Sequence, residues 1–411
     1  MILSCSVYAL LIVLILFGCK FAWRKNEFND DFLSLDVTKS LRGLAAIGVI
    51  LHHISQESAF QKVKELSPFV NAGFYFVAIF FFCSGFGLIK SLKTKENYLD
   101  GFLKKRVLKT IVIPFYVCVL LYGIYKLIMG VKMPVAHWIT NLLGLTLMND
   151  YAWYPIVLSI LYVAFYFIFK YVKNRKLCFA LMFLVIFAQG VFFAFNGHFA
   201  WWAGEKNWWL KPNAWANAQW WMQQRIIWFY GEWWVNSSIA FFIGMIYANF
   251  EEKIVAWFKK CYWIKLVALL VLWMTFNFIS RMAQWKLGYW SEYSGKGPGI
   301  LNKFVCYLSQ LPQVTFFVLF SFTIMMKFYS VNPITKFFGN LSYETYMMNL
   351  IAIEVFRFLL YSNNSTGGWP IPIYKTGNYN LAIYAGAVLA SSILLGIVYK
   401  YLNKLAIKWI K

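Results

Sequence analysis

Two ionisable residues on one apolar stretch give the clearest chemical signal in the sequence. In SLDVTKSLRGLAAIGVILHH, Arg42 is followed after ten intervening residues by His53. Along an α-helix this step returns to within about 20° of the same azimuth and climbs about 16 Å, so His53 is predicted to lie above Arg42 while His52 points about 80° away. The small Ala45 and Ala46 between them predict room for a narrow cavity on that face.

His53 has the chemistry of a general base. Ionisable side chains inside membrane helices are costly and are functional-site candidates by default. A general base takes the proton from a group that reacts as a nucleophile, such as a hydroxyl. The alternative is a core histidine that is hydrogen-bonded to the carbonyl of a neighbouring helix.

The composition of the chain requires a membrane as its solvent. Hydrophobic residues make up 61% of the chain and charged residues 13%, which indicates an all-α polytopic membrane protein. The net charge of +23 comes from short basic clusters between apolar runs, so we attribute it to topology and expect no nucleic-acid partner. The seven cysteines show no paired spacing, and we expect neither a disulfide framework nor a metal site.

Eleven apolar runs are long enough to cross about 30 Å of hydrocarbon as transmembrane helices. They lie near residues 2–23, 38–54, 69–89, 108–129, 153–172, 177–195, 234–250, 264–280, 304–327, 338–361 and 381–403.

The first run is interpreted as an additional N-terminal transmembrane helix, within residues 1–30, that precedes a membrane domain at 34–411. The segment 131–151 is predicted to be re-entrant or interfacial. The basic residues 170–176, which follow the span 153–172, are cytoplasmic only if the chain enters and leaves the segment 131–151 on the same side of the membrane. The same excess of basic residues in alternate loops predicts an N-terminus outside and a cytoplasmic C-terminus.

Four stretches, in order, resemble motifs of the membrane-bound acyltransferase-3 family. LRGLAAIGVILHH matches the first motif with Arg42 and His53, and GFYFVAIFFFCSGF ends in the family's Ser-Gly-Phe, which begins here at Ser84. FLKKRVLKTIVIPFY and LSYETYMMN match the other two, with Lys109 in place of the second arginine of an Arg-x-x-Arg pair and Asn349 in place of a terminal histidine.

The resemblance implies an integral-membrane O-acyltransferase of a bacterial plasma membrane, with His53 and Arg42 as its catalytic residues. It would move an acyl group, most simply acetyl, from cytoplasmic acyl-CoA to a hydroxyl of an external or lipid-linked glycan. Its partners would be acyl-CoA, a glycan or glycolipid acceptor and membrane lipid, with no tightly bound cofactor.

The predicted donor site lies at the cytoplasmic rim. Arg42, Lys105, Arg106 and Lys109 are expected there, because guanidinium forks bind phosphate groups such as those of coenzyme A. Ordinary positive-inside residues are the alternative. Ser84 and the glycine after it are predicted to end a helix and to admit a pantetheine arm, with close helix packing as the alternative.

The predicted acyl or acceptor pocket draws mainly on the last motif. Tyr343 and Tyr346 share a helix face and could donate hydrogen bonds to the acyl group. The remaining candidates for this pocket are His52, Glu344, Asn349, Trp201 and Trp202.

Two further interpretations concern loops and ion pairs. The Trp-rich segment 196–234 suits either sugar stacking or a membrane-interface belt. Glu354 and Arg357 are predicted to form a structural i, i+3 ion pair. A glycan transporter or flippase that performs no chemistry, and a catalytically silent relative, remain alternative functions.

Overall fold

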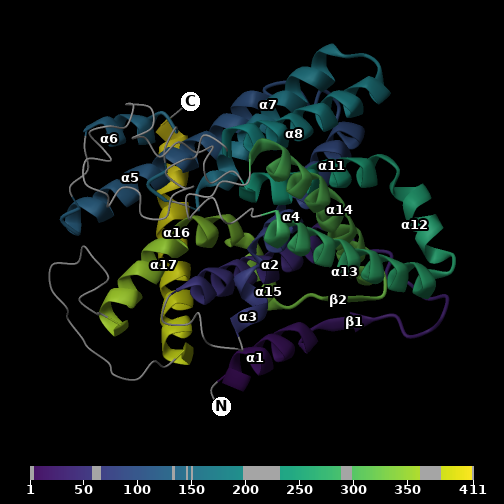
Figure 1. Cartoon of the computed structure of the whole chain (residues 1–411), viewed down its shortest axis with the longest axis horizontal. Helices are drawn as coiled ribbons and strands as arrows, with labels where there is room; N and C mark the ends of the chain where they lie inside the picture. Colours follow the sequence, from purple (N-terminus) through teal and green to yellow (C-terminus); the bar gives the residue numbers. More distant parts are fainter. Residues whose placement is uncertain are drawn as a thin grey trace.

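The computed structural model describes residues 4–57, 66–131, 135–144, 147–149, 151–197, 232–287, 299–361 and 381–409 (Figure 1). These residues form a helical bundle and a single sheet of two short strands. The elements are α1 (Ser4–Leu16), β1 (Cys19–Phe21), α2 (Leu35–Gln56), α3 (Ser67–Val70), α4 (Gly73–Thr94), the π-helix η2 (Leu103–Val112), α5 (Ile113–Ile128), α6 (Val135–Leu142), α7 (Trp153–Tyr171), α8 (Arg175–Gly197), α11 (Glu232–Asn249), α12 (Glu251–Lys259), α13 (Tyr262–Lys286), α14 (Gly299–Met325), β2 (Phe328–Ser330), α15 (Pro333–Asn340), α16 (Ser342–Tyr361) and α17 (Leu381–Trp409).

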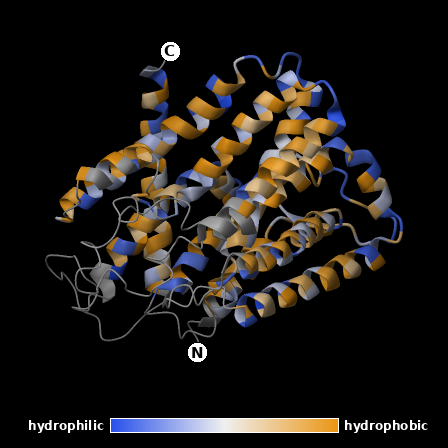
Figure 2. Ribbon diagram, turned by 45° about the horizontal axis from the view of Figure 1, so that its top comes forward, coloured by the Kyte–Doolittle hydropathy of each residue, from blue (hydrophilic) through white to orange (hydrophobic). Residues whose placement is uncertain are grey.

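The helices have the length and composition of an integral membrane protein. Among the described residues, six helical stretches are long and apolar enough to cross a membrane, namely Gly73–Thr94, Leu103–Ile128, Trp153–Tyr171, Tyr262–Lys286, Phe304–Met325 and Ile383–Trp409. Helices α1, α2, α8, α11 and α16 fall on the other five predicted runs. Hydrophobic residues extend along the helices, and hydrophilic ones gather in the connecting turns (Figure 2). The total of eleven spans stays a prediction.

The first predicted span, 2–23, is wrong in its extent. Helix α1 ends at Leu16, and Cys19–Phe21 then pairs antiparallel with Phe328–Ser330 as a two-stranded sheet. Gly18 makes this change of direction possible, since its φ of 73° lies in the left-handed region and a Cβ there would overlap the carbonyl oxygen of Val331.

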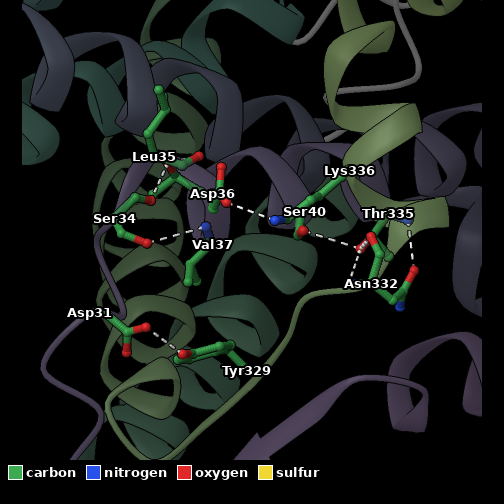
Figure 3. A network of polar contacts seen from close by, with 11 residues as sticks. Asp31, Ser34, Leu35, Asp36, Val37, Ser40, Tyr329, Asn332, Thr335 and Lys336 are labelled. Atoms are coloured by element: carbon green, nitrogen blue, oxygen red, sulfur yellow. Dashed lines mark hydrogen bonds and ion pairs between the residues drawn. The ribbon is translucent and has the colours of Figure 1, made fainter.

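The predicted span 338–361 is two helices, because the chain turns at Leu341 between α15 and α16. Asn332 caps α15 by accepting a hydrogen bond from the backbone N–H of Thr335 at 2.8 Å (Figure 3). The hydroxyl groups of Thr335 and Ser40 lie 3.1 Å apart, and this bond ties α15 to the first half of α2.

The segment 131–151 contains, in its described part, only the short helix α6. Eight residues of α-helix extend about 12 Å, well short of the hydrocarbon thickness. The prediction that this segment does not cross the membrane agrees with that length.

Helix α2 runs through the centre of the bundle, with α3, α4, α15 and α16 around it (Figure 1). The two helices α2 and α15 approach so closely that only glycine fits at two positions. A Cβ on Gly43 would overlap the carbonyl oxygen of Thr335, and a Cβ on Gly339 would overlap the carbonyl oxygen of Lys39. This backbone-to-backbone packing fixes which face of α2 turns away from α15.

Candidate active site

Helix α2 carries both Arg42 and His53 in one uninterrupted helix. Ser34 begins it as the N-cap, accepting a hydrogen bond from the backbone N–H of Val37 at 3.4 Å, and Asp36 places a negative charge in its first turn. The helix continues to Gln56, so the predicted spacing of about 16 Å between the levels of Arg42 and His53 applies.

Arg42 lines an inner cavity of about 190 Å³ that is rich in hydroxyl groups. Ser84 of α4 and Arg106 of η2 line it as well. The other hydroxyl-bearing residues of its lining are Thr110, Tyr154, Tyr162, Ser342, Tyr343 and Tyr346. Residues that the sequence places far apart therefore meet around one space.

Two further cavities adjoin the inner one. The middle cavity, of about 490 Å³, shares Arg42, Ser84, Arg106 and Tyr162 with it and adds Lys90. The outer cavity, of about 340 Å³, shares Arg106 with both and includes Lys95 and Lys105. The lining thus carries mixed charge at the outside, where Glu96 and Asp100 accompany the lysines, then two arginines, and then tyrosines at the inside.

The π-helix η2 decides which of its residues reach the cavities. Its i to i+5 hydrogen bonds bring residues four and five apart onto one face, where an α-helix would align residues three and four apart. Thr110 and Ile111, four and five residues after Arg106, line the inner cavity with it, whereas Lys109 lines none of these three cavities. The place of Lys109 in a donor site stays a prediction.

His53 is buried, with 5% of its surface exposed, and is not part of the lining of the inner cavity. Its Nδ1 is 3.0 Å from Oδ1 of Asn349, and Nδ2 of Asn349 donates to the carbonyl oxygen of Tyr346 at 2.9 Å. Because a carbonyl only accepts, that second bond turns Oδ1 of Asn349 toward the imidazole, so Nδ1–H of His53 donates. The lone pair of a neutral His53 is therefore on Nε2, as a general base requires.

Tyr151 covers one face of His53, and the sequence did not single it out. The two rings are 3.5 Å apart between centroids and inclined by 6°. The hydroxyl of Tyr346, a residue of the inner cavity lining, donates to the backbone carbonyl of Tyr151. Tyr151 ends the segment that was expected at membrane depth, but nothing in that segment's sequence indicates a ring stacked on a histidine from another helix.

The side chain of His52 points toward α3 and α4, and its ring centroid lies 5.3 Å from that of His53. Its Nδ1 lies 2.7 Å from the carbonyl oxygen of Phe69, and its ring packs where a Cβ on Gly73 would overlap it. The interpretation as a core histidine bonded to a carbonyl thus describes His52. It lines none of these three cavities, and neither does His53, so its expected place in the acyl pocket stays a prediction.

Several expectations about neighbouring residues are corrected. Helix α4 does not end at Ser84 but continues to Thr94, and Gly85 packs directly on the backbone carbonyl of Phe241 in α11, so close packing explains the glycine. Ser84 still lines the inner cavity. The predicted narrow cavity beside Ala45 and Ala46 is not one of the three, because both alanines are packed in the core.

The acidic residues of α16 form pairs with other elements. Glu344 lies 3.8 Å from Lys400 of α17 and does not line the inner cavity, and its expected place in the acyl pocket stays a prediction. Glu354 pairs with Lys126 of α5, and Arg357 pairs with Glu57, at 3.4 and 3.3 Å. The predicted pair between Glu354 and Arg357 within α16 is therefore replaced by two bridges between elements.

Two predicted features cannot be placed. Trp201 and Trp202 lie outside the described residues. Within the described part of the chain, no three His, Cys, Asp or Glu side chains gather as metal ligands would.

The fold and the site define a class: a polytopic helical membrane protein with a buried histidine and a cavity that is lined by two arginines and by hydroxyl groups. The model of the acyltransferase-3 family, described as an acyltransferase domain, matches residues 32–401. The chain therefore belongs to this family of membrane acyltransferases. Comparison with curated proteins and with solved structures gave no match.

Proposed function

We propose that this protein is an O-acyltransferase that moves an acyl group, most simply acetyl, from cytoplasmic acyl-CoA to a hydroxyl of an external or lipid-linked glycan. One observation carries the proposal. The inner cavity that Arg42 and Arg106 line also has Tyr346 in its lining. The hydroxyl of Tyr346 donates to the residue stacked on His53, and its carbonyl accepts from the hydrogen-bond partner of His53.

The change in cavity lining supports acyl-CoA as the donor. Lysines and arginines suit the phosphates of coenzyme A, and arginine binds them in bidentate fashion. Hydroxyl donors suit the carbonyl oxygen of a thioester, whose negative charge grows in the transition state. In this arrangement Tyr343, which lines the inner cavity, is the better donor of the two predicted tyrosines, because the hydroxyl of Tyr346 is engaged with the carbonyl of Tyr151.

The donor, the acceptor and His53 account for every bond and proton in the reaction. The acceptor hydroxyl gives its proton to Nε2 of His53 while its oxygen forms a bond to the thioester carbonyl carbon. The bond from that carbon to sulfur then breaks, and the proton passes from the imidazolium to the thiolate, so the products are an ester and free CoA thiol. A relay with a transient acyl group on Nε2 of His53 gives the same products in two steps.

The orientation in the membrane follows from the basic residues. We place residues 90–107 and the C-terminus in the cytoplasm and the Trp-rich segment outside, where its aromatic faces suit sugar rings. An impermeant thiol reagent should label a cysteine introduced at Lys206 in intact cells and leave one at Lys95 unlabelled, in a background without native cysteines. The reverse labelling would overturn this orientation.

Purified protein incubated with radiolabelled acetyl-CoA and candidate glycans tests the function. The proposal predicts thiol release together with transfer of label to a glycan. Thiol released in an amount equal to the protein without any acceptor would indicate the relay on His53. Movement of a glycan across vesicle membranes without thiol release would indicate a transporter instead.

A further inference from the structure

Tyr151 and His53 are stacked almost without lateral offset. Carbon atoms of stacked rings pack at about 3.5 Å, and the centroids of these two rings are 3.5 Å apart with the planes inclined by 6°. The imidazole therefore lies over the centre of the phenol ring.

This geometry favours the protonated histidine over the neutral one. Two neutral aromatic rings prefer an offset or edge-to-face arrangement, because their electron-rich faces repel when they overlap fully. A cation over the centre of a ring is attracted by the same face. An interaction that strengthens as His53 takes up a proton stabilises the transition state more than the ground state, which is what accelerates a reaction.

The structure holds Tyr151 in this position through both of its peptide groups. Its N–H donates to Oδ1 of Asn149 at 3.0 Å, and Nδ2 of Asn149 donates to the carbonyl oxygen of Met347 at 2.8 Å. Its carbonyl accepts from the hydroxyl of Tyr346. Helix α16 thus holds Tyr151 through its residues 346 and 347, and it holds His53 through Asn349. The same helix therefore positions both rings.

We propose that Tyr151 stabilises His53 as an imidazolium during acyl transfer and is therefore a positioning residue of the reaction. This inference rests on the proposed function, because it assigns a proton to His53 at the transition state. It adds an aromatic face, supplied by the segment between α6 and α7, to a site otherwise built from α2 and α16.

The first test compares Tyr151→Leu with Tyr151→Phe. The leucine variant, which removes the ring face, should lower kcat about ten- to thirtyfold while KM for acetyl-CoA stays near the wild-type value. The phenylalanine variant keeps the ring face and should retain most of kcat. Equal losses in both variants, or a wild-type kcat for the leucine variant, would overturn the proposal.

A second series keeps the size of the ring and so protects the test against misfolding. Phenylalanine at position 151 is replaced by its mono-, di- and trifluorinated forms, which withdraw charge from the ring face step by step. The proposal predicts that log kcat falls steadily with each fluorine, whereas unfolding temperature and donor affinity do not change. A flat series overturns it.

Different results would disprove the proposed function and the role of Tyr151. If the wild-type protein releases no thiol from acyl-CoA with any acceptor, the proposed function fails. If the wild type transfers label and His53→Ala does not, while the fluorinated series is flat, only the role of Tyr151 fails.

Discussion

The two ends of α2 differ in what surrounds them. At the Arg42 end, cavities of about 190 and 490 Å³ meet, and the side chain lies among other basic and hydroxyl groups. At the His53 end the imidazole is enclosed, with Asn349 on its edge and Tyr151 on its face. One helix therefore carries a group suited to holding an anionic ligand and, about 16 Å further on, a group suited to moving a proton.

This difference separates binding from chemistry along one helix. A cation that contacts phosphate works where solvent and ligand enter, because ions are costly to bury without partners. A base that must accept and return a proton works best when water is excluded and its tautomer is fixed. Changes at the two ends should therefore alter different kinetic constants.

The largest effect is expected at the His53 end of α2. His53→Ala should lower kcat for acyl transfer by about 10² to 10⁴, the usual loss for a general base, in an assay of thiol release. His52→Ala is the matched control, since its ring faces α3 and α4, and it should retain measurable activity. Both variants must elute as monodisperse protein. Normal transfer by His53→Ala together with an inactive His52→Ala would show that the wrong histidine has been assigned.

A smaller effect, on KM rather than on kcat, is expected at the Arg42 end of α2. Arg106→Ala should raise KM for acetyl-CoA about ten- to a hundredfold with little change in kcat, because it removes charged hydrogen bonds to phosphate. Lys109→Ala, three residues away, lines none of the described cavities and should leave KM near the wild-type value. Equal increases in both variants would mean that the segment acts only through its overall charge.

The smallest effect concerns the packing of α2 against α15, which orients the Arg42 end of α2. Gly43→Ala should destabilise the protein by about 1–3 kcal/mol, since its Cβ would meet the backbone of α15. Thermal unfolding in detergent measures this. The control is Gly386→Ala in α17, where a Cβ would meet no described atom within 4 Å, and it should be neutral or stabilising. A neutral Gly43→Ala would indicate that α2 and α15 pack less closely.

The sequence predicted the helical membrane class and the pairing of Arg42 with His53 on one helix, because both depend on local periodicity. It did not predict the turn at Leu341 or the β1–β2 pair, which depend on contacts between distant segments. Lys109 was expected in the donor site from its place in the Arg-x-x-Arg pattern, which does not reveal that η2 is a π-helix with Thr110 and Ile111 in the lining of the inner cavity. Tyr151 was missed because its partner comes from another helix, and stacking across elements leaves no spacing pattern.

The division between the two ends is the central claim, and binding of a non-transferable thioether analogue of acetyl-CoA tests it most directly. Titration calorimetry on the wild type, Arg106→Ala and His53→Ala compares the ends without any turnover. The account predicts that Arg106→Ala binds the analogue about ten- to a hundredfold more weakly and that His53→Ala binds it like the wild type. Wild-type affinity in Arg106→Ala, or an equal loss in His53→Ala, would contradict it.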